Sequence, residues 1–481
     1  MKHRHPARSA VGLMFTNADW PQTTITGTTV SSPLPRIVLA HGCFDLLHLG
    51  HIRHLQEARA QGDYLIVSVT IDDHVGKGIG RPHFSLAERV EALQALAIVD
   101  EVIVSDSADA VNVINQIKPS VYCKGMDYAD HEGYAFQRES KAVEAHGGRV
   151  HLTATQMWSS SRLINTMMFS EEVIRYLEGA RKRGLRDRIA LAAARAAELQ
   201  VCFVGETIID EYRYVEALGR PSKEFMLATV ETDAEVFQGG IVAASKHGEW
   251  RNVECITPAK TIRKTRYVDR DFNRKLFDVY SARKLDLSDT ARLTYRADLR
   301  GAVDRAAVVI VNDFGHGLLG PEERNILMGA RFLAVNAQTN AGNFGFNPVT
   351  KYRRAHYVCV DNPEARLATG LEEAPVCEVA NSIYARMGQP HVLVTHGKHG
   401  SFYFNGTQSG DAPVFALGGV DTMGAGDAVM AVTAPLIAAG LDLEAAAFVG
   451  NVVGGIKVSI LGHRRHVAAH EWQQTVESLL K

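Results

Sequence analysis

The ten residues 42–51, GCFDLLHLGH, decide the fold of the first part of this chain. They follow a short apolar run, residues 36–40 (RIVLA), and precede an amphipathic stretch, residues 52–60. This order predicts a strand, a tight glycine turn and a helix that opens near His48. His48 and His51 then lie at a helix N-terminus, where backbone N–H groups and the helix dipole favour an anion. Two imidazoles aimed at one anionic spot suit a triphosphate under attack at its α-phosphorus.

The same stretch resembles the GxFDxxHxGH signature of the cytidylyltransferase-like nucleotidyltransferases, which it matches nearly letter for letter. The resemblance implies that His48 and His51 stabilise the transition state of nucleotidyl transfer. It also implies that Gly42, Phe44 and Asp45 bind the nucleotide. Read without the resemblance, the histidines are an ordinary surface pair or two metal ligands, although no third ligand follows at a recognisable spacing.

Further groups fall, in order, where the resembled family carries nucleotide-binding residues. They are a lysine in a glycine-flanked loop, an arginine on the helix after 85–88, a lysine that ends a strand, and three hydroxyls before a helix: Lys77, Arg89, Lys124, Ser159, Ser160 and Ser161. The three serines depart from the more usual Ser-Thr-Thr, which leaves open which hydroxyl contacts phosphate. The implied reaction, with Mg²⁺, is attack of a substrate phosphate on the α-phosphorus of ATP or CTP. Because the nucleophile is already an anion, no general base is required.

A second motif, residues 420–429 (VDTMGAGDAV), lies far along the chain and precedes an apolar helix. Gly424 and Gly426 let successive backbone N–H groups converge on an oxyanion at the helix start. Asp427 places a carboxylate at the same spot, which suits a base that takes a proton from a sugar hydroxyl. The motif resembles the DTxGAGD signature of the ribokinase-like (PfkB) sugar kinases, which use ATP.

Supporting elements of that family occur in its order. The resemblance implies sugar binding by Asp210, Gly239 and Gly240, and indirect binding of Mg²⁺ by Glu364 through water. It implies nucleotide binding by Thr395, Gly397, Gly400, Gly424, Ala425, Gly426 and Asn451. Three departures concern the acceptor and the metal: Glu206 replaces an Asp, Asp361 replaces an Asn, and Ala or Ser follows the double glycine where Asn is usual.

Composition bounds the class of protein. The chain has 481 residues, 46% hydrophobic and 22% charged, with a net charge of −2 and no long basic run, so we expect no nucleic-acid partner and no membrane partner. The six cysteines are scattered without a CxxC pair, which is typical of reduced thiols in a cytoplasmic protein. No apolar run approaches a membrane span, and the basic N-terminus lacks the apolar region of a secretory signal.

Short β-branched runs at 36–40, 64–70, 101–104, 120–124 and 149–153 alternate with helical patterns near 51–60, 86–97, 109–117 and 136–146. This alternation predicts an α/β fold with a parallel, doubly wound sheet. We expect a flexible tail over 1–34, a Rossmann-like HxGH nucleotidyltransferase domain over 35–168 and a helical linker over 169–198. A second doubly wound domain, ribokinase-like, is expected over 199–481.

Together the two halves resemble, in reversed order, the bifunctional heptose-phosphate kinase/adenylyltransferases of lipopolysaccharide-heptose synthesis. The resemblance implies phosphorylation of a sugar or sugar phosphate by ATP, and nucleotidyl transfer to a sugar 1-phosphate. The expected partners are those small molecules and a nucleoside triphosphate, with a homodimer left open. An alternative stays open: a cytidylyltransferase that makes a CDP-alcohol or CDP-sugar, with a PfkB domain that is either a kinase for another sugar or a sugar-binding module without catalysis.

Overall fold

The computed structural model of the chain describes residues 35–75, 81–107, 109–125, 134–154, 168–219, 228–272, 274–340, 342–416 and 418–481. The expected tail, residues 1–34, lies outside the described residues, as do Lys77, Ser159, Ser160 and Ser161. Among the described helices, none combines the length and the apolar character needed to cross a lipid bilayer.

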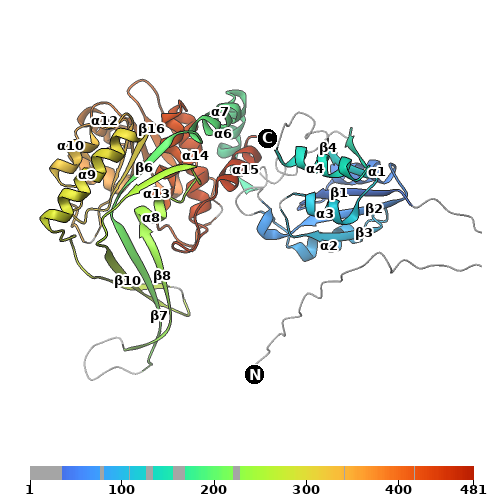
Figure 1. The fold of residues 1–481 in the computed structure, drawn as a ribbon, viewed down its shortest axis with the longest axis horizontal. Coiled ribbons are helices and arrows are strands. Elements are labelled where there is room, and N and C mark those ends of the chain that lie inside the picture. The colour runs from blue at the N-terminus through green and yellow to red at the C-terminus, as the bar shows by residue number, and fades with distance from the viewer. Residues whose placement is uncertain are drawn as a thin grey trace, which may run out of the picture.

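The first domain is built on a five-stranded sheet, coloured blue to teal in Figure 1. Its elements are β1 (Ile37–Gly42), α1 (Leu49–Arg59), β2 (Tyr64–Thr70), the 3₁₀ helix η1 (Asp72–His74), α2 (Leu86–Gln94), β3 (Glu101–Ser105), α3 (Val111–Ile117), β4 (Val121–Gly125), α4 (Tyr134–Ala145) and β5 (Arg149–Thr153). The strand order is β3-β2-β1-β4-β5, and every neighbouring pair is parallel. The predicted doubly wound sheet is therefore confirmed, with strand ends within a residue or two of the prediction.

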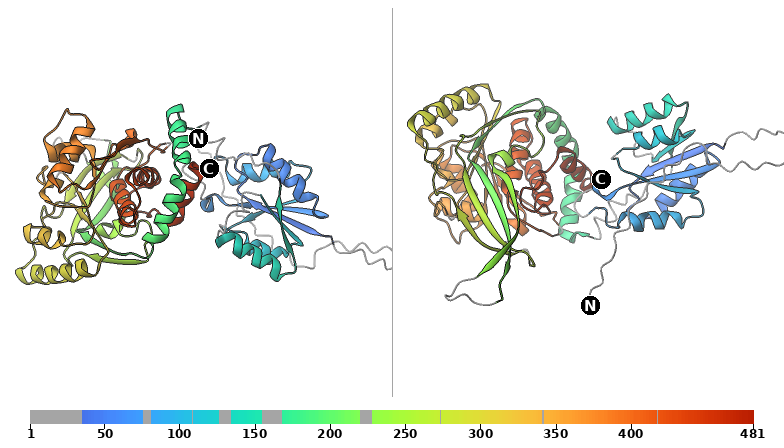
Figure 2. Two further views of the ribbon diagram at one scale, coloured as in Figure 1. Left: turned by 90° about the horizontal axis from the view of Figure 1, so that it is seen from above. Right: turned by 60° about the horizontal axis from the view of Figure 1, so that its bottom comes forward.

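Helices cover both faces of this sheet (Figure 2). On one face, Leu55 of α1 and Leu93 of α2 join Val38 and Ala40 of β1 in one apolar core. On the other face, α3 and α4 contribute to a second core around Leu39 of β1. β1 alternates its side chains between these two cores, because successive residues of a strand point to opposite faces. A strand buried on both faces has to be apolar throughout, and this explains the short β-branched runs in the sequence.

The second domain contains two sheets. Its elements are α6 (Glu171–Lys182), α7 (Leu185–Ala196), β6 (Gln200–Gly205), β7 (Thr207–Ala217), β8 (Thr229–Gly240), α8 (Ile241–Ala244), β9 (Asn252–Ile256), β10 (Ile262–Asp269), β11 (Arg274–Tyr280), α9 (Asp289–Arg305), β12 (Val308–Asp313), α10 (Pro321–Leu327), β13 (Leu333–Ala337), η3 (Val349–Lys351), β14 (Tyr357–Asp361), α11 (Asn362–Thr369), α12 (Val376–Arg386), β15 (His391–Thr395), η4 (Gly397–His399), β16 (Ser401–Phe404), β17 (Ser409–Ala412), α13 (Ala425–Ala438), α14 (Leu443–Lys457) and α15 (Ala469–Leu479).

The larger sheet has eight strands in the order β17-β16-β15-β14-β13-β12-β6-β9. The six strands from β15 to β9 run parallel, and β16 and β17 are antiparallel additions at one edge. α9, α10, α11 and α12 pack in the core on one face, whereas α13, α14 and α15 pack in the core on the other (Figure 1). This is the doubly wound arrangement that was predicted for the second domain.

Helices α6 and α7 occupy the region for which a helical linker was expected. Their apolar residues, among them Leu177, Leu185 and Ile189, are buried in the same core as α13 and α14. Arg188 of α7 pairs with Asp442 at the start of α14, 2.6 Å away. Packing of this extent belongs to a domain and not to a linker, so we propose that the second domain begins near residue 170.

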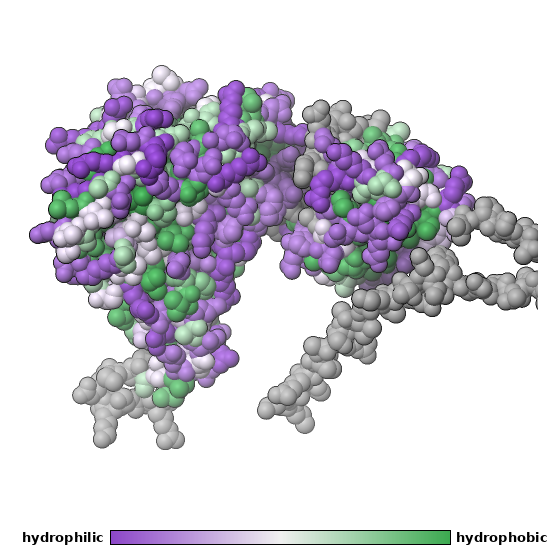
Figure 3. Space-filling view, viewed as in Figure 1, coloured by the Kyte–Doolittle hydropathy of each residue, from purple (hydrophilic) through white to green (hydrophobic). Residues whose placement is uncertain are grey.

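The smaller sheet, in the order β11-β10-β7-β8, was not predicted. Its strands project from the body of the second domain (Figure 1), and β7 pairs parallel with β10 and antiparallel with β8. Apolar side chains of this sheet reach the surface, including Val236, Phe277 and Val279, each about half exposed or more. Figure 3 shows green apolar patches among polar residues on this projecting part.

Candidate active sites

The first candidate site lies at the carboxyl ends of β1 and β4. In the order β3-β2-β1-β4-β5 the chain winds outward in both directions from these two strands, and ligands of open α/β sheets bind at such a switch point. His48 is the N-cap of α1, and its Nδ1 accepts a hydrogen bond of 3.0 Å from the backbone N–H of Gly50. The rings of His48 and His51 stack with centroids 4.1 Å apart. The two imidazoles that the motif predicted at one helix N-terminus are thus side by side.

Phe44 and Asp45 shape the loop that leads to this pair. Phe44 is buried with a φ of +50°, and its ring lies 5.4 Å from that of His51. Asp45 is also buried; its Oδ1 accepts the backbone N–H groups of His83 and Phe84 at 2.7 and 2.9 Å. Its Oδ2 lies 3.4 Å from the Arg81 guanidinium. The carboxylate therefore fastens the loop after β1 to the segment before α2. Gly42, at the end of β1, leaves room for the Phe44 ring, which would lie 3.2 Å from an added Cβ.

Arg89 was expected to line the phosphate path, but it is buried beneath the loop with 1% of its surface exposed. Its guanidinium donates to the carbonyl oxygens of Phe84, Cys43 and Thr70 at 3.1, 2.6 and 2.9 Å. It also contacts the Asp72 carboxylate at 2.5 Å. Five N–H groups are matched here by four protein oxygens, so the geometry favours a role in positioning the loops rather than in binding phosphate.

Lys124 is the second-last residue of β4, at the same switch point, and is 7% exposed. Its ammonium lies 3.4 Å from Glu139 of α4, whose carboxylate also accepts the Tyr122 hydroxyl at 3.0 Å. On the other side, the Thr153 hydroxyl donates to the Lys124 carbonyl at 3.3 Å and lies 2.8 Å from the His54 ring. These contacts join the ends of β4 and β5 to α1.

The second candidate site lies at the N-terminus of α13. Gly424 caps this helix with a φ of +69°, and Ala425, Gly426 and Asp427 form its first turn. Asp427 is buried, and its Oδ1 accepts the side-chain amides of Asn312 and Gln338 at 2.8 and 3.0 Å. Burial raises the pKa of Asp427, while the Asn312 hydrogen bond opposes that rise. Neither Asn312 nor Gln338 was predicted from the sequence motifs, although each follows the apolar residues of a strand.

Further carboxylates gather at the carboxyl end of β14. Asp361 caps α11 by accepting the Glu364 backbone N–H at 2.7 Å, and Glu364 accepts the Thr339 N–H at 3.0 Å. Burial, with Asp361 and Asp427 nearby, raises the pKa of Glu364 to about 8. Like charges so close repel one another, and a divalent cation would relieve that repulsion. The donor set therefore fits the Mg²⁺ expected near Glu364.

Asp210 of β7 and the double glycine that ends β8 meet next to this site. A Cβ added to Gly239 would lie 2.0 Å from Asp210 Oδ2, so only glycine leaves room for the carboxylate. Gly240 has a φ of +61° and is equally tight against the Glu206 carbonyl, 2.4 Å from an added Cβ. His463 Nε2 lies 3.3 Å from Asp210. The structure thus brings together the three residues expected on the acceptor side.

Glu206, which replaces the family's usual Asp, is fully buried. Its carboxylate accepts the backbone N–H groups of Phe314, His316 and Leu318 at 3.2, 3.1 and 3.4 Å. Burial and the neighbouring Asp313 raise the pKa of Glu206 to about 7. The longer side chain thus organises the loop after β12.

Of the residues expected to bind the kinase nucleotide, Gly400 and Asn451 contact the end of β17, whereas Gly424, Ala425 and Gly426 lie at the start of α13. Thr395 ends β15, Gly397 starts η4, and a Cβ on Gly400 would lie 2.1 Å from the Ala412 carbonyl. Asn451 of α14 donates to the Ala412 and Pro413 carbonyls at 2.8 and 3.0 Å. Asn451 therefore positions this segment through its amide group.

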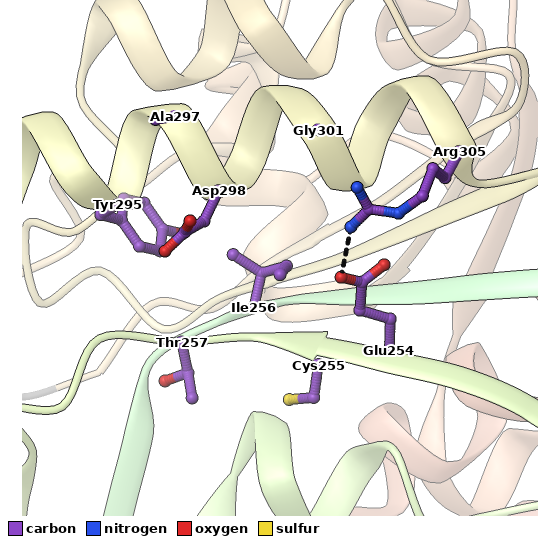
Figure 4. A pocket seen from close by; sticks show the side chains of 9 residues that line it. All are labelled: Glu254, Cys255, Ile256, Thr257, Tyr295, Ala297, Asp298, Gly301 and Arg305. Carbon is purple, nitrogen blue, oxygen red and sulfur yellow. Dashed lines mark hydrogen bonds and ion pairs between the residues drawn. The ribbon is translucent and has the colours of Figure 1, made fainter.

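A separate cavity of about 330 Å³ lies between β9 and α9 (Figure 4). Glu254 and Arg305 form an ion pair of 2.6 Å at its wall, and Tyr295 and Asp298 of α9 line it as well. None of the expected site residues lines this cavity.

The chain thus contains two α/β domains, each with motif residues at a helix N-terminus. Residues 39–166 match the cytidylyltransferase-like family, and residues 349–467 match the pfkB family of carbohydrate kinases. Both resemblances drawn from the motifs are therefore confirmed: the chain carries a cytidylyltransferase-like domain followed by a pfkB carbohydrate kinase domain.

Among curated proteins, the chain is similar to the bifunctional protein HldE of Geobacter sulfurreducens, with 40% identity over 121 residues, 25% of this chain and 24% of that protein. It is 42% identical over 130 residues to HldE of Pseudomonas fluorescens, 27% of each chain. These matches lie in the N-terminal region, and the chain spans about a quarter of the length of these relatives.

Among solved structures, ribokinase from Thermotoga maritima aligns with 17% identity and a TM-score of 0.44, covering 58% of this chain and 99% of that one. Arabidopsis thaliana ribokinase complexed with ribose and ATP aligns with 16% identity and a TM-score of 0.44, covering 59% and 99%.

Proposed function

We propose that this chain is a bifunctional enzyme of nucleotide-sugar synthesis. Its second domain phosphorylates a sugar or sugar phosphate with ATP, and its first domain transfers a nucleotidyl group from a nucleoside triphosphate to a sugar 1-phosphate. The observation that carries the proposal is the placement of Asp427, buried at the N-terminus of α13 and oriented by Asn312 and Gln338.

In the kinase step, Asp427 takes the proton of an acceptor hydroxyl held by Asp210. The hydroxyl oxygen attacks the γ-phosphorus of ATP, and ADP leaves. The backbone N–H groups of the turn at Gly424 and Gly426 bind the transferring phosphoryl group at the helix N-terminus. A base is useful here because a neutral hydroxyl, unlike a phosphate, must lose a proton.

When bound, Mg²⁺ neutralises phosphate charge in both steps. In the kinase site Glu364, held by the Thr339 N–H and placed beside Asp361, would bind the ion through water.

In the transferase step, an oxygen of the sugar 1-phosphate attacks the α-phosphorus, and the bond to pyrophosphate breaks. His48 and His51 stabilise the charge that develops there, since they lie together where the helix dipole also favours an anion. Asp45 and Arg89 hold the surrounding loops, and Lys124, paired with Glu139, lies near the end of β4.

The test uses the full chain with Mg²⁺, ATP or CTP, and a panel of free sugars, sugar phosphates and sugar 1-phosphates. ADP and pyrophosphate are measured separately. We expect Asp427→Asn to abolish sugar-dependent ADP formation and to keep pyrophosphate release. His51→Ala should do the reverse, so each variant is the folding control of the other.

Two outcomes would overturn parts of the proposal. Sugar binding without ADP formation would make the second domain a sugar-binding module. Pyrophosphate release with CTP and an alcohol phosphate, but with no sugar 1-phosphate, would make the first domain a cytidylyltransferase of another substrate class.

A further inference from the structure

Lys457, the last residue of α14, is fully buried, and neither reaction described above uses it. Its ammonium donates to the Met423 carbonyl at 2.8 Å and to the Gly462 carbonyl at 2.8 Å. Met423 precedes the glycine that caps α13, and Gly462 lies in the loop after α14. One buried cation therefore joins the glycine turn to a distant loop.

Charges of both signs act on this ammonium: Asp421 and Asp427 favour its charged form, whereas Arg465 and Lys275 oppose it. Asp421 accepts the Gly462 N–H at 3.0 Å, the Met423 N–H at 3.2 Å and the Lys275 ammonium at 2.8 Å. Burial lowers the pKa of Lys457, whereas Asp421 and Asp427 oppose that shift. A buried charge is costly unless it is paired and hydrogen-bonded, and here two carbonyls and two carboxylates offset that cost.

The contact with Met423 also fixes the next N–H group. In a trans peptide the C=O of one residue and the N–H of the next point in opposite directions. Holding the Met423 carbonyl toward Lys457 therefore turns the Gly424 N–H away from it. The Lys457 stem packs beneath the same residue, since a Cβ on Gly424 would lie 3.5 Å from its Cε.

We propose that Lys457 is a positioning residue of the kinase site, a built-in cation that holds the turn over Asp421–Gly424 with its N–H groups directed at the transferring phosphoryl group. This inference rests on the proposed kinase function. It implies that the native enzyme needs no added monovalent cation at this turn. It also implies that K⁺ or NH₄⁺ can enter once the side chain is removed, because carbonyl oxygens replace the hydration shell of such ions.

The experiment compares full-length wild type, Lys457→Met and Lys457→Ala in KCl, NH₄Cl or choline chloride of equal ionic strength. We expect Lys457→Met to lower kcat about tenfold to a hundredfold with little change in the KM for ATP. KCl or NH₄Cl should restore part of the activity of Lys457→Ala, and the bulky choline ion should not. Lys260→Met, which removes an exposed ammonium–carbonyl contact of 2.7 Å to Asp286, is the matched control and should behave as wild type.

A wild-type kcat in Lys457→Met, or equal rescue by choline, would overturn the inference.

If the wild type phosphorylates no acceptor, the kinase proposal fails, and thermal unfolding then tests the role of Lys457 by itself. K⁺ and NH₄⁺ should then raise the melting temperature of Lys457→Ala relative to choline, without doing so for wild type, and equal shifts in all three salts would refute the role. If both lysine variants fail to fold, Asp421→Asn should lower kcat, because Asp421 holds the same turn through the Met423 and Gly462 N–H groups. An unchanged kcat in Asp421→Asn would refute the proposed role of this turn.

Discussion

Asn312 donates its side-chain amide to Asp427 over 2.8 Å, which joins the carboxyl end of β12 to the first turn of α13. Gln338, beyond the end of β13, donates to the same carboxylate oxygen at 3.0 Å. Both hydrogen bonds orient the carboxylate and favour its charged form. Burial acts in the opposite direction and raises the pKa of Asp427. These two amides therefore oppose the rise in the pKa of Asp427 that burial causes.

Replacing Asn312 by Leu should therefore raise the pKa of Asp427 further. Because a protonated carboxylate cannot accept the hydroxyl proton, kinase activity is lost as pH falls through that pKa. We expect the acid limb of the kcat profile to move to higher pH by about one unit. The ADP-release assay across pH measures this shift. The surface variant Asn252→Ala should keep the wild-type profile, and an unshifted limb in Asn312→Leu would contradict the assignment of Asp427 as base.

The two roles of His48 can be separated by substitution. His48→Ala removes the helix cap and the imidazole together, so we expect a loss of about 1 kcal/mol of stability and a hundredfold or so loss of pyrophosphate release. His48→Asn should restore most of the stability, since Asn is a good N-cap, and leave the rate low. Thermal unfolding and pyrophosphate release measure the two effects. Recovery of the rate by Asn would mean that His48 is only a cap.

Much of the fold follows from local sequence. β2 occupies the predicted range because a parallel strand buried on both faces must be an apolar run, whereas β5, at the edge of the sheet, is only partly buried. The four-stranded sheet escaped prediction because β8 is mostly polar and exposed, with no such run. In addition β7 pairs with β10, a partner that lies some fifty residues away.

The candidate sites likewise contain residues that local sequence predicts and residues that only the packing of the chain brings in. The glycine turn before Asp427 and the His48–His51 pair carry local motifs, so sequence reasoning finds them. Asn312 acts on a residue 115 positions away, and its role emerges only when β12 and α13 pack together. Arg89 remains a predicted nucleotide-binding residue, and the sequence does not show that its guanidinium is buried against carbonyl oxygens.

Gly239→Ala tests the close approach of β8 to Asp210. The added Cβ would lie 2.0 Å from Oδ2, so the carboxylate has to move. We expect a loss of about 1–3 kcal/mol of stability and a raised KM for the acceptor, with the KM for ATP unchanged. Gly418→Ala is the matched control, because no atom lies within 4 Å of its added Cβ. An unchanged KM for the acceptor would show that Asp210 does not bind the acceptor.

Arg89→Ala distinguishes a positioning role from phosphate binding. Removing a buried guanidinium takes a donor from three carbonyl oxygens, whereas the half-exposed Asp72 carboxylate keeps the Leu86 N–H, and we expect a loss of about 3–5 kcal/mol. Arg89→Lys should not restore it, because a single ammonium cannot reach acceptors on all sides. Arg138→Ala, in an exposed ion pair with Asp109, is the control with little expected effect. If Arg89→Ala unfolds like the wild type but binds the nucleoside triphosphate more weakly, Arg89 is a phosphate ligand instead.

Glu206 should make stability depend on pH. Burial and Asp313 raise its pKa from 4.5 to about 7, so between these values the folded chain holds a proton that the unfolded chain has released. Stability contributed by this group is present below pH 4.5 and is lost as pH rises toward 7, by up to about 3 kcal/mol. Glu206→Gln should flatten that part of the unfolding curve, whereas the exposed Glu198→Gln should not. A slope that persists in Glu206→Gln would show that another group binds the proton.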